Sequence, residues 1–380
     1  FAPDQSGAAS VFYELGGILV ICDAGGCTGN VCGFDEPRWF GERSAIFSAG
    51  LRDMDAILGR DDRLVAKLTD AAEKIDANFA AVIGTPVPAV IATDYRALQR
   101  MCEKKTNLPI LTVDTNGMEL YDVGEEKAWL TLFKTFAGKD VASQKEASEE
   151  DDSSKKMKIG VLGLTPHDVS DLNIEEKFRK SENENTHYIC YGMRAGIDKV
   201  KTAGSADKNL VVAPAALETA KYLEKEYKMP YVVGTPVGTF TEEIVQALEK
   251  KERYPYKRLH EENSDKEQPG SGKNDKEVML IGEPVTTESL ALAIEQKYGI
   301  PVHVLCPLQE TEDLLFRTSR QVLGEEDMEE ALKDADIIAA DPMYRPICPK
   351  KCEFYELPHL AFSGRIYKKK LEKIEDFWKY

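Results

Sequence analysis

Short apolar runs that end in Gly or Pro recur along the chain, and each is followed by a stretch with helical periodicity. The run at 17–22 leads into a Gly- and Cys-rich loop, and the run at 79–83 leads into a Gly-Thr-Pro turn. Strands that alternate with helices form parallel sheets through right-handed crossovers, so the pattern predicts an α/β fold. The predicted strands are 17–22, 79–83, 108–113, 158–164, 210–213, 231–233, 278–281, 302–305 and 336–340, and the predicted helices are 94–104, 217–228, 289–298 and 325–334.

Two polar segments, at 138–156 and 261–277, divide the chain into three blocks. They contain few large apolar residues, so burial cannot offset the entropy lost when they become ordered. We therefore predict three doubly wound, Rossmann-like α/β domains with parallel sheets, joined by two linkers. In such domains ligands bind at the carboxyl ends of the strands. The predicted parts are domain 1–137, linker 138–156, domain 157–260, linker 261–277 and domain 278–380.

Charge and hydropathy exclude two classes of partner. The formal net charge is −17, and a chain of that sign without a basic patch repels nucleic acid. No apolar stretch reaches the ~20 residues that a membrane span needs. A charged start followed by an apolar run is also missing, so we expect no signal peptide and a cytoplasmic location.

Cysteine usage indicates metal or redox chemistry rather than a disulfide scaffold. Of the eight cysteines, Cys22, Cys27 and Cys32 fall within eleven residues directly after the first predicted strand. Iron–sulfur clusters need thiolates on such loops, with backbone N–H groups nearby. The alternative is a Gly-rich turn with incidental cysteines. Cys22 ends an apolar strand, which favours a core position, so Cys27 and Cys32 are the better candidate ligands.

Glycines accompany these thiols and let the backbone turn tightly against a bulky ligand. One chain offers few ligands, and two thiolates from each of two subunits would complete the four that a [4Fe–4S] cluster takes. The glycines in question are Gly25, Gly26, Gly29 and Gly33, of which Gly26 and Gly29 are the candidate cofactor-binding positions.

Other candidate residues carry weaker signals. His167 follows a predicted strand and either lines a cleft or belongs to a turn with a helix cap. Cys348 and Cys352, with Arg345 and His359 nearby, are a candidate second thiol site. No phosphate-binding glycine motif of the P-loop or dinucleotide type occurs, so the chain shows no sign of a nucleotide site.

The order and spacing of several segments resemble those of a known family. They are a small-residue turn at 2–8 followed by the apolar run up to Cys27, the stretch 51–59 with Leu64, the segment 82–86 with Ile91 and Asp94, the segments 209–212 and 222–230, and the strand 334–338. Together they resemble nitrogenase component 1 proteins. This family includes the molybdenum–iron protein subunits, their cofactor-assembly scaffold relatives and the catalytic component of dark-operative protochlorophyllide reductase.

The resemblance implies a division of labour between proteins. Members of the nitrogenase component 1 family are dimers of homologous subunits with iron–sulfur clusters at the subunit interface. A separate ATP-hydrolysing iron–sulfur reductase, similar to the nitrogenase iron protein, delivers low-potential electrons to them. These electrons reach a substrate or cofactor that is held between three domains.

The chain departs from the family pattern at its ligand positions. Cys27 matches the family's Gly-Cys ligand. The early ligand cysteine is missing, with Asp4 as a candidate replacement, and Thr85 takes the place of the later one. The cysteine that holds the nitrogenase cofactor falls near Ala213, which cannot ligate iron. These departures favour one bridging [4Fe–4S] cluster on Cys27 and Cys32 over a larger cluster, and they argue against a nitrogen-reducing subunit.

The leading hypothesis is a nitrogenase-like oxidoreductase subunit, in a homodimer or heterodimer, whose substrate is unknown. Two alternatives stay open. One is a non-catalytic scaffold that assembles or carries a metallocofactor, and the other is an iron-free α/β binding protein. Turnover with an ATP-dependent reductase separates the first two, and iron and sulfide analysis separates both from the third.

Overall fold

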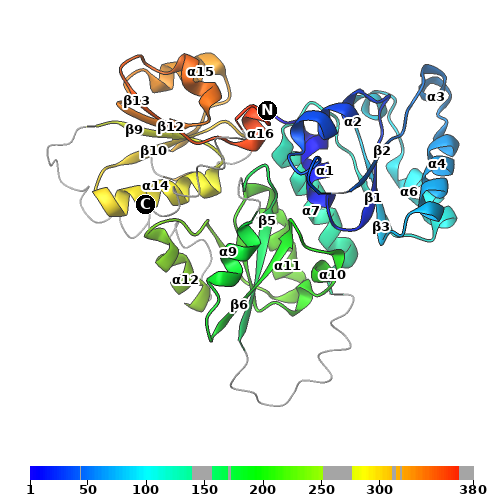
Figure 1. The fold of residues 1–380 in the computed structure, drawn as a ribbon, viewed down its shortest axis with the longest axis horizontal. Coiled ribbons are helices and arrows are strands. Elements are labelled where there is room, and N and C mark those ends of the chain that lie inside the picture. Colours follow the sequence, from blue (N-terminus) through cyan, green and yellow to red (C-terminus); the bar gives the residue numbers. More distant parts are fainter. Residues whose placement is uncertain are drawn as a thin grey trace. The chain divides into compact units, whose positions relative to one another are not determined.

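The computed structural model contains three β-sheets with helices between their strands (Figure 1). The sheets confirm the predicted α/β class with several parallel sheets. None of the helices described is long and apolar enough to cross a membrane. Apart from their end residues, both predicted linkers lie outside the described part of the chain. The structure describes residues 1–42, 44–138, 156–169, 173–250, 276–309, 314–316 and 319–367, without the side chain of Ala56.

The first sheet has the order β2-β1-β3-β4 and is parallel throughout. Its two central strands are buried at every position, which explains why they appear in the sequence as continuous apolar runs. Its strands are β1 (Gly17–Ile21), β2 (Ala45–Ser48), β3 (Phe79–Ile83) and β4 (Ile110–Val113).

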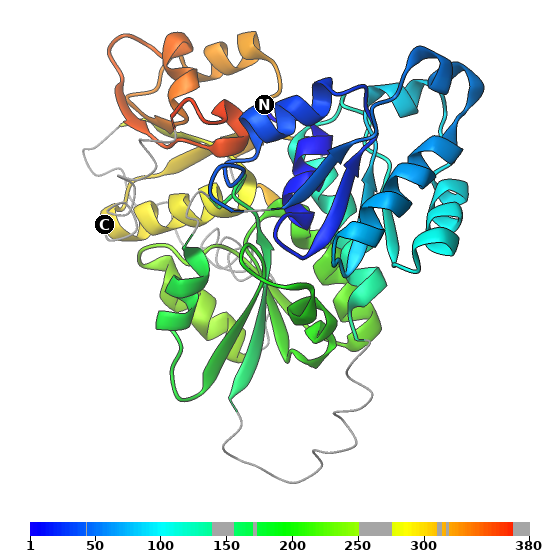
Figure 2. The ribbon, with the colours of Figure 1, turned by 45° about the vertical axis from the view of Figure 1, so that its right-hand side comes forward.

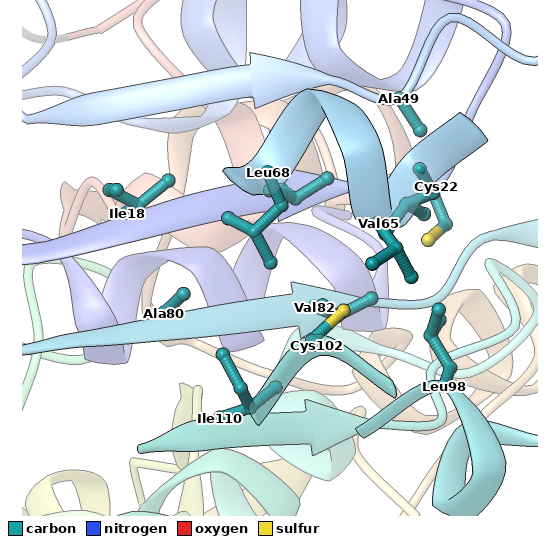
Figure 3. Close-up of a cluster of buried hydrophobic side chains, with 12 residues drawn as sticks. Ile18, Cys22, Ala49, Val65, Leu68, Ala80, Val82, Leu98, Cys102 and Ile110 are labelled. Atoms are coloured by element: carbon teal, nitrogen blue, oxygen red, sulfur yellow. The ribbon is translucent and has the colours of Figure 1, made fainter. Parts of the chain in front are cut away.

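Helices cover both faces of this sheet (Figures 1 and 2). On one face, α4 (Asp61–Lys74) and α6 (Tyr95–Thr106) pack against β1 and β3 in a continuous apolar cluster, shown in Figure 3. The side chain of Asp94 caps α6 by accepting a hydrogen bond from the Ala97 N–H. The remaining short elements of this region are α2 (Gly26–Asn30), the π-helix η1 (Val31–Asp35), α3 (Asp53–Leu58) and α5 (Pro86–Val90).

On the other face, α1 (Asp4–Phe12) crosses α7 (Tyr121–Phe136). This segment forms a helix and not the small-residue turn that the resemblance implied, and every residue of the helix is buried. Small side chains allow it, because Gly7 and Gly124 lie where the two backbones touch. A Cβ on Gly7 would come within 2.0 Å of the Tyr121 carbonyl oxygen. Phe79 of β3 continues this core with its ring against Phe12 and Phe136.

The second sheet has the order β6-β5-β7-β8. Its strands are β5 (Met157–Leu164), β6 (Thr186–Gly192), β7 (Lys208–Val211) and β8 (Tyr231–Val233). The helices of this region are α9 (Ile174–Lys180), α10 (Ile197–Lys201), α11 (Leu217–Tyr227) and α12 (Phe240–Lys250), with short 3-10 turns η2 (Ala203–Ser205) and η3 (Pro214–Ala216).

The third sheet has the parallel order β11-β10-β9-β12-β13. The chain runs from β9 to β10 on one side and then returns to β12 on the other, so the strand order reverses at β9. Ligands of open α/β sheets bind outside the carboxyl ends of the strands at such a reversal. The elements are β9 (Val278–Ile281), α14 (Pro284–Tyr298), β10 (Val302–Cys306), β11 (Arg320–Gln321), α15 (Glu325–Leu332), β12 (Ile337–Ala340), η5 (Pro342–Ile347), β13 (Glu353–Glu356) and α16 (Leu360–Ser363).

The contacts within the chain form two compact units. Unit 1 comprises Phe1–Lys158, Leu164–His167 and Leu172–Ala206, and contains the first sheet. Unit 2 comprises Ile159–Gly163, Asp168–Asp171 and Asp207–Tyr380, and contains the third sheet. The division into three domains stays a prediction, and each unit is described by itself below.

Candidate functional site

The candidate cysteines follow β1 in unit 1, but they occupy different surroundings. Cys22 is 2% exposed and belongs to the apolar cluster beneath α4 and α6. Figure 3 shows its sulfur among the buried side chains, which include Cys102. Burial raises the pKa of the Cys22 thiol to about 12. This thiol therefore stays protonated at neutral pH, and its placement supports a packing role.

Cys27 lies in the first turn of α2 and is half-buried. Burial, followed by the charge of Asp23, raises the pKa of its thiol, and a side-chain hydrogen bond with Thr85 opposes that rise. Thr85 follows β3, is fully buried, and donates its hydroxyl to the Cys22 carbonyl at 2.6 Å. Thr85 thus joins the loops that follow β1 and β3, and the structure brings it together with Cys27.

Cys32 lies in the π-helix η1 and is 9% exposed. π-helical turns are rare and occur frequently at functional sites. The charge of Cys32 contributes to the raised pKa of Tyr13, whereas Cys27 interacts with Asp23 and Asp4. Within the described residues, no group of three or more His, Cys, Asp or Glu side chains is arranged to hold a metal ion.

The loop that carries these thiols has one open side. A Cβ atom added at any of its four glycines would meet no atom within 4 Å. The space beside this half-buried thiol can accommodate a bulky group or a second protein chain, and the cofactor-binding role of Gly26 and Gly29 stays a prediction. The open positions are Gly25, Gly26, Gly29 and Gly33.

Asp23 holds the start of this loop in place. Its carboxylate accepts hydrogen bonds from the Thr28 N–H at 2.7 Å, the Thr28 hydroxyl at 2.9 Å and the Ser48 hydroxyl at 2.6 Å. The loop after β1 is thereby tied to the end of β2. Sequence reasoning missed this residue, although it directly follows Cys22.

Asp4, the candidate replacement ligand, is fully buried at the start of α1. Its carboxylate accepts hydrogen bonds from the backbone N–H groups of Gln5, Asn116 and Gly117 at 2.7–2.8 Å. Burial raises its pKa although these bonds lower it. Asp4 therefore anchors α1 to the loop after β4, and metal binding would compete with those three bonds.

His167 is fully buried in unit 1 rather than exposed to a cleft. Its Nδ1 lies 2.9 Å from Glu125 Oε1, and its Nε2 lies 3.2 Å from the Asp35 carbonyl oxygen. Burial lowers the pKa of the imidazole, but the hydrogen bond and charge of Glu125 outweigh that effect and raise it. Because Asp35 ends the π-helix, His167 supports the turn that carries Cys32.

A buried ion-pair network supports the segment just after this π-helix. Arg38 donates from Nε to Glu36 Oε1 at 2.8 Å and from Nη1 to Glu14 Oε2 at 2.9 Å. A third donation, from Nη2, reaches the Ser10 carbonyl oxygen at 2.7 Å. Buried charges persist only when they are paired in this way. Sequence reasoning missed these residues, because their partners are up to 28 positions apart.

A second polar group lies in unit 2, at the carboxyl edge of the third sheet. Glu283 follows β9 and is 1% exposed, and it accepts hydrogen bonds from the Val285 and Thr286 N–H groups at 2.7 Å. His359 follows β13, and its Nε2 lies 3.6 Å from Asp168 Oδ1. Burial, followed by the charge of Asp168, raises the pKa of Glu283 to about 8. Asp168 and Glu283 therefore form a buried acid pair at the position where the strand order reverses.

The acid pair should make stability depend on pH. The pKa of Glu283 is about 8 in the folded chain against the ordinary 4.5, so the folded state binds more protons between these values. Stability should therefore fall as pH rises from about 4.5 to 8. Glu283→Gln should remove a drop on the order of a few kcal/mol between pH 5 and pH 8 in urea unfolding. The exposed Glu329→Gln is the matched control, and an unchanged pH slope in Glu283→Gln would contradict the assignment.

Comparisons with known proteins agree with this architecture. Solved structures titled "Nitrogenase Cp1 at pH 5" and "Nitrogenase Cp1 at pH 6.5" share the fold, with TM-scores of 0.66 and 0.62. Their sequence identities to this chain are 15% and 14%, and each match covers 100% of this chain and 89% of the other. No curated protein matches the chain in sequence.

A sequence model of the family described as nitrogenase component 1 type oxidoreductase matches residues 5–341. The match includes the thiol loop after β1, all three sheets up to the end of β12, and the buried acid pair. The resemblance inferred from the sequence is confirmed. This chain belongs to the nitrogenase component 1 type oxidoreductase family.

Proposed function

We propose that this chain is one subunit of a nitrogenase-like oxidoreductase that receives low-potential electrons from an ATP-dependent iron–sulfur reductase and reduces a small molecule. The observation that supports this proposal most directly is Cys27, a half-buried thiol at the carboxyl edge of a parallel sheet beside open space. A [4Fe–4S] cluster bound there would supply one-electron transfer at low potential.

The chain's own residues would hold such a cluster in a defined way. Cys27 and Cys32 are the thiolate donors, and Thr85 and Asp23 fix the position of the loop between them and β1. Both thiols of one chain make only half of the usual four ligands. A homologous subunit, either identical or different, would supply the other half across a two-fold axis.

The cluster should therefore couple iron content to dimer formation, because metal sites stabilise the assembly that provides their ligands. We expect anaerobically purified protein to contain iron and sulfide and to sediment as a dimer. Treatment with a chelator should shift it towards monomer at low concentration. An iron-loaded monomer would contradict a shared cluster.

The same measurements address the two other functions. Protein without iron or sulfide would indicate an iron-free binding protein. Iron-loaded protein that turns over no substrate with any ATP-dependent reductase would indicate an assembly scaffold. The scaffold remains a candidate because Thr85 occupies a family ligand position, which reduces the thiols available in this chain.

A further inference from the structure

Cys348 and Cys352 of unit 2 lie on either side of a tight turn between η5 and β13. Cys348 directly follows η5, and Cys352 directly precedes β13. The Cys352 N–H donates to the Pro349 carbonyl oxygen at 3.1 Å, which closes the turn. Both thiols are reduced and half-buried. The pair is therefore accessible to a small reagent.

The two cysteine side chains interact with each other across this turn. Cys348 donates its thiol to the Tyr344 carbonyl oxygen at 3.2 Å. Burial and the neighbouring Cys352 raise the pKa of Cys348 to about 11, although the charge of Arg345 opposes this. The Cys348 thiol is therefore protonated at neutral pH, and we assign the first attack to Cys352.

Contacts with neighbouring residues fix the turn between Cys348 and Cys352 at the edge of the third sheet that is opposite the acid pair. The Arg345 guanidinium lies 4.8 Å from the centre of the Phe354 ring and so joins η5 to β13. The Glu353 N–H donates to the Asp336 carbonyl oxygen at 2.8 Å, at the amino end of β12. Cys352 thus lies at the amino edge of the third sheet, opposite the edge that carries Glu283.

The donor set favours a dithiol over a metal site. Structural zinc takes four protein ligands, and no third His, Cys, Asp or Glu joins this pair to make a metal-binding group in the part of the chain that the structure describes. The turn also contains Lys350 and Lys351, which are both exposed.

We propose that Cys348 and Cys352 form a thiol–disulfide exchange site that is oxidised reversibly by a low-molecular-weight disulfide such as glutathione disulfide. The Cys352 thiolate attacks one sulfur of the reagent, the reagent's S–S bond breaks, and one glutathione thiolate leaves. Cys348 then loses its proton and attacks the Cys352 sulfur, which releases the second glutathione. Two protein thiols are oxidised, one glutathione disulfide is reduced, and both protons end on glutathione.

The full chain, reduced and then exposed to glutathione disulfide, tests this site by tryptic mapping without reductant. Trypsin cuts after Lys350 and Lys351, between the two cysteines, so the oxidised pair appears as two peptides joined by a disulfide that separate on reduction. We expect this linked species in the wild type, with the fully buried Cys102 and Cys306 unmodified as internal controls.

Single variants test the order of attack. Cys348→Ser should accumulate a glutathione adduct on Cys352, and Cys352→Ser should form its adduct on Cys348 about tenfold more slowly, because the raised pKa lowers the thiolate fraction. Two thiols that stay free, lasting adducts on both cysteines of the wild type, or zinc retained by the reduced pair would each overturn the proposal. Since neither cysteine belongs to the thiol loop of unit 1, these outcomes leave the proposed function unaffected.

Discussion

Cys27→Ala should lower the iron and sulfide content of anaerobically purified protein to background. Cys27 is the thiol that combines partial exposure with open space beside it, and a four-iron cluster that loses a thiolate from each subunit keeps only half of its ligands. Cys32→Ala should have the same effect. Iron and sulfide assays together with the visible absorption of the cluster measure both variants.

Cys22→Ala is the matched control within the same loop. Its thiol packs in the core with Cys102 and Val82, so the substitution should leave most of the iron in place while it lowers the melting temperature. Equal iron content in the wild type and in Cys27→Ala would refute the cluster. Loss of iron only in Cys22→Ala would show that the strand and the loop are assigned in the wrong register.

Strands that are buried along most of their length could be predicted from the sequence, because burial on both faces requires a continuous apolar run. The predicted strands 79–83, 231–233 and 278–281 coincide with β3, β8 and β9. Each is a continuous apolar run bounded by polar, Gly or Pro residues, and these interruptions mark the ends.

Four of the six edge strands and the small-residue helix α1 have no such apolar pattern. The edge strands β2, β6, β11 and β13 were missed, because most of them are short and partly exposed and therefore lack an apolar run. The edge strands β4 and β8 are mostly buried and were predicted. Helix α1 is buried all round and rich in small residues, so it shows no amphipathic period. This helix is stabilised by packing against α7, which lies more than 100 residues later in the chain. A pattern within a short sequence window cannot reveal that contact.

The same limit applies to the candidate site. The thiol loop could be proposed from local sequence, because cysteines and glycines after an apolar run are typical of a ligand-binding turn, whereas Thr85 was proposed from the family resemblance. The environment of His167 could not, since its partners Glu125 and Asp35 are 42 and 132 positions away. The pairing of Glu283 with Asp168 likewise requires the fold to bring two distant strand ends together.

The crossing of α1 and α7 should tolerate no side chain at Gly124. A Cβ there would lie 1.8 Å from the Asp4 carbonyl oxygen and 2.5 Å from its carbonyl carbon, so the clash is with backbone that no rotamer change can relieve. Gly7 is equally restricted on the opposite helix. Overpacking of this kind costs about 3 kcal/mol or more.

Gly124→Ala should therefore lower the melting temperature by roughly 5–10 °C. Separation of the helices would also pull Asp4 away from the Asn116 and Gly117 N–H groups, which adds unpaired buried polar groups to the cost. Gly29→Ala, on the open side of the thiol loop, is the matched control and should melt within about 1 °C of the wild type, because its Cβ meets nothing. A Gly124→Ala protein that melts like the wild type would show that α1 does not pack against α7 in solution.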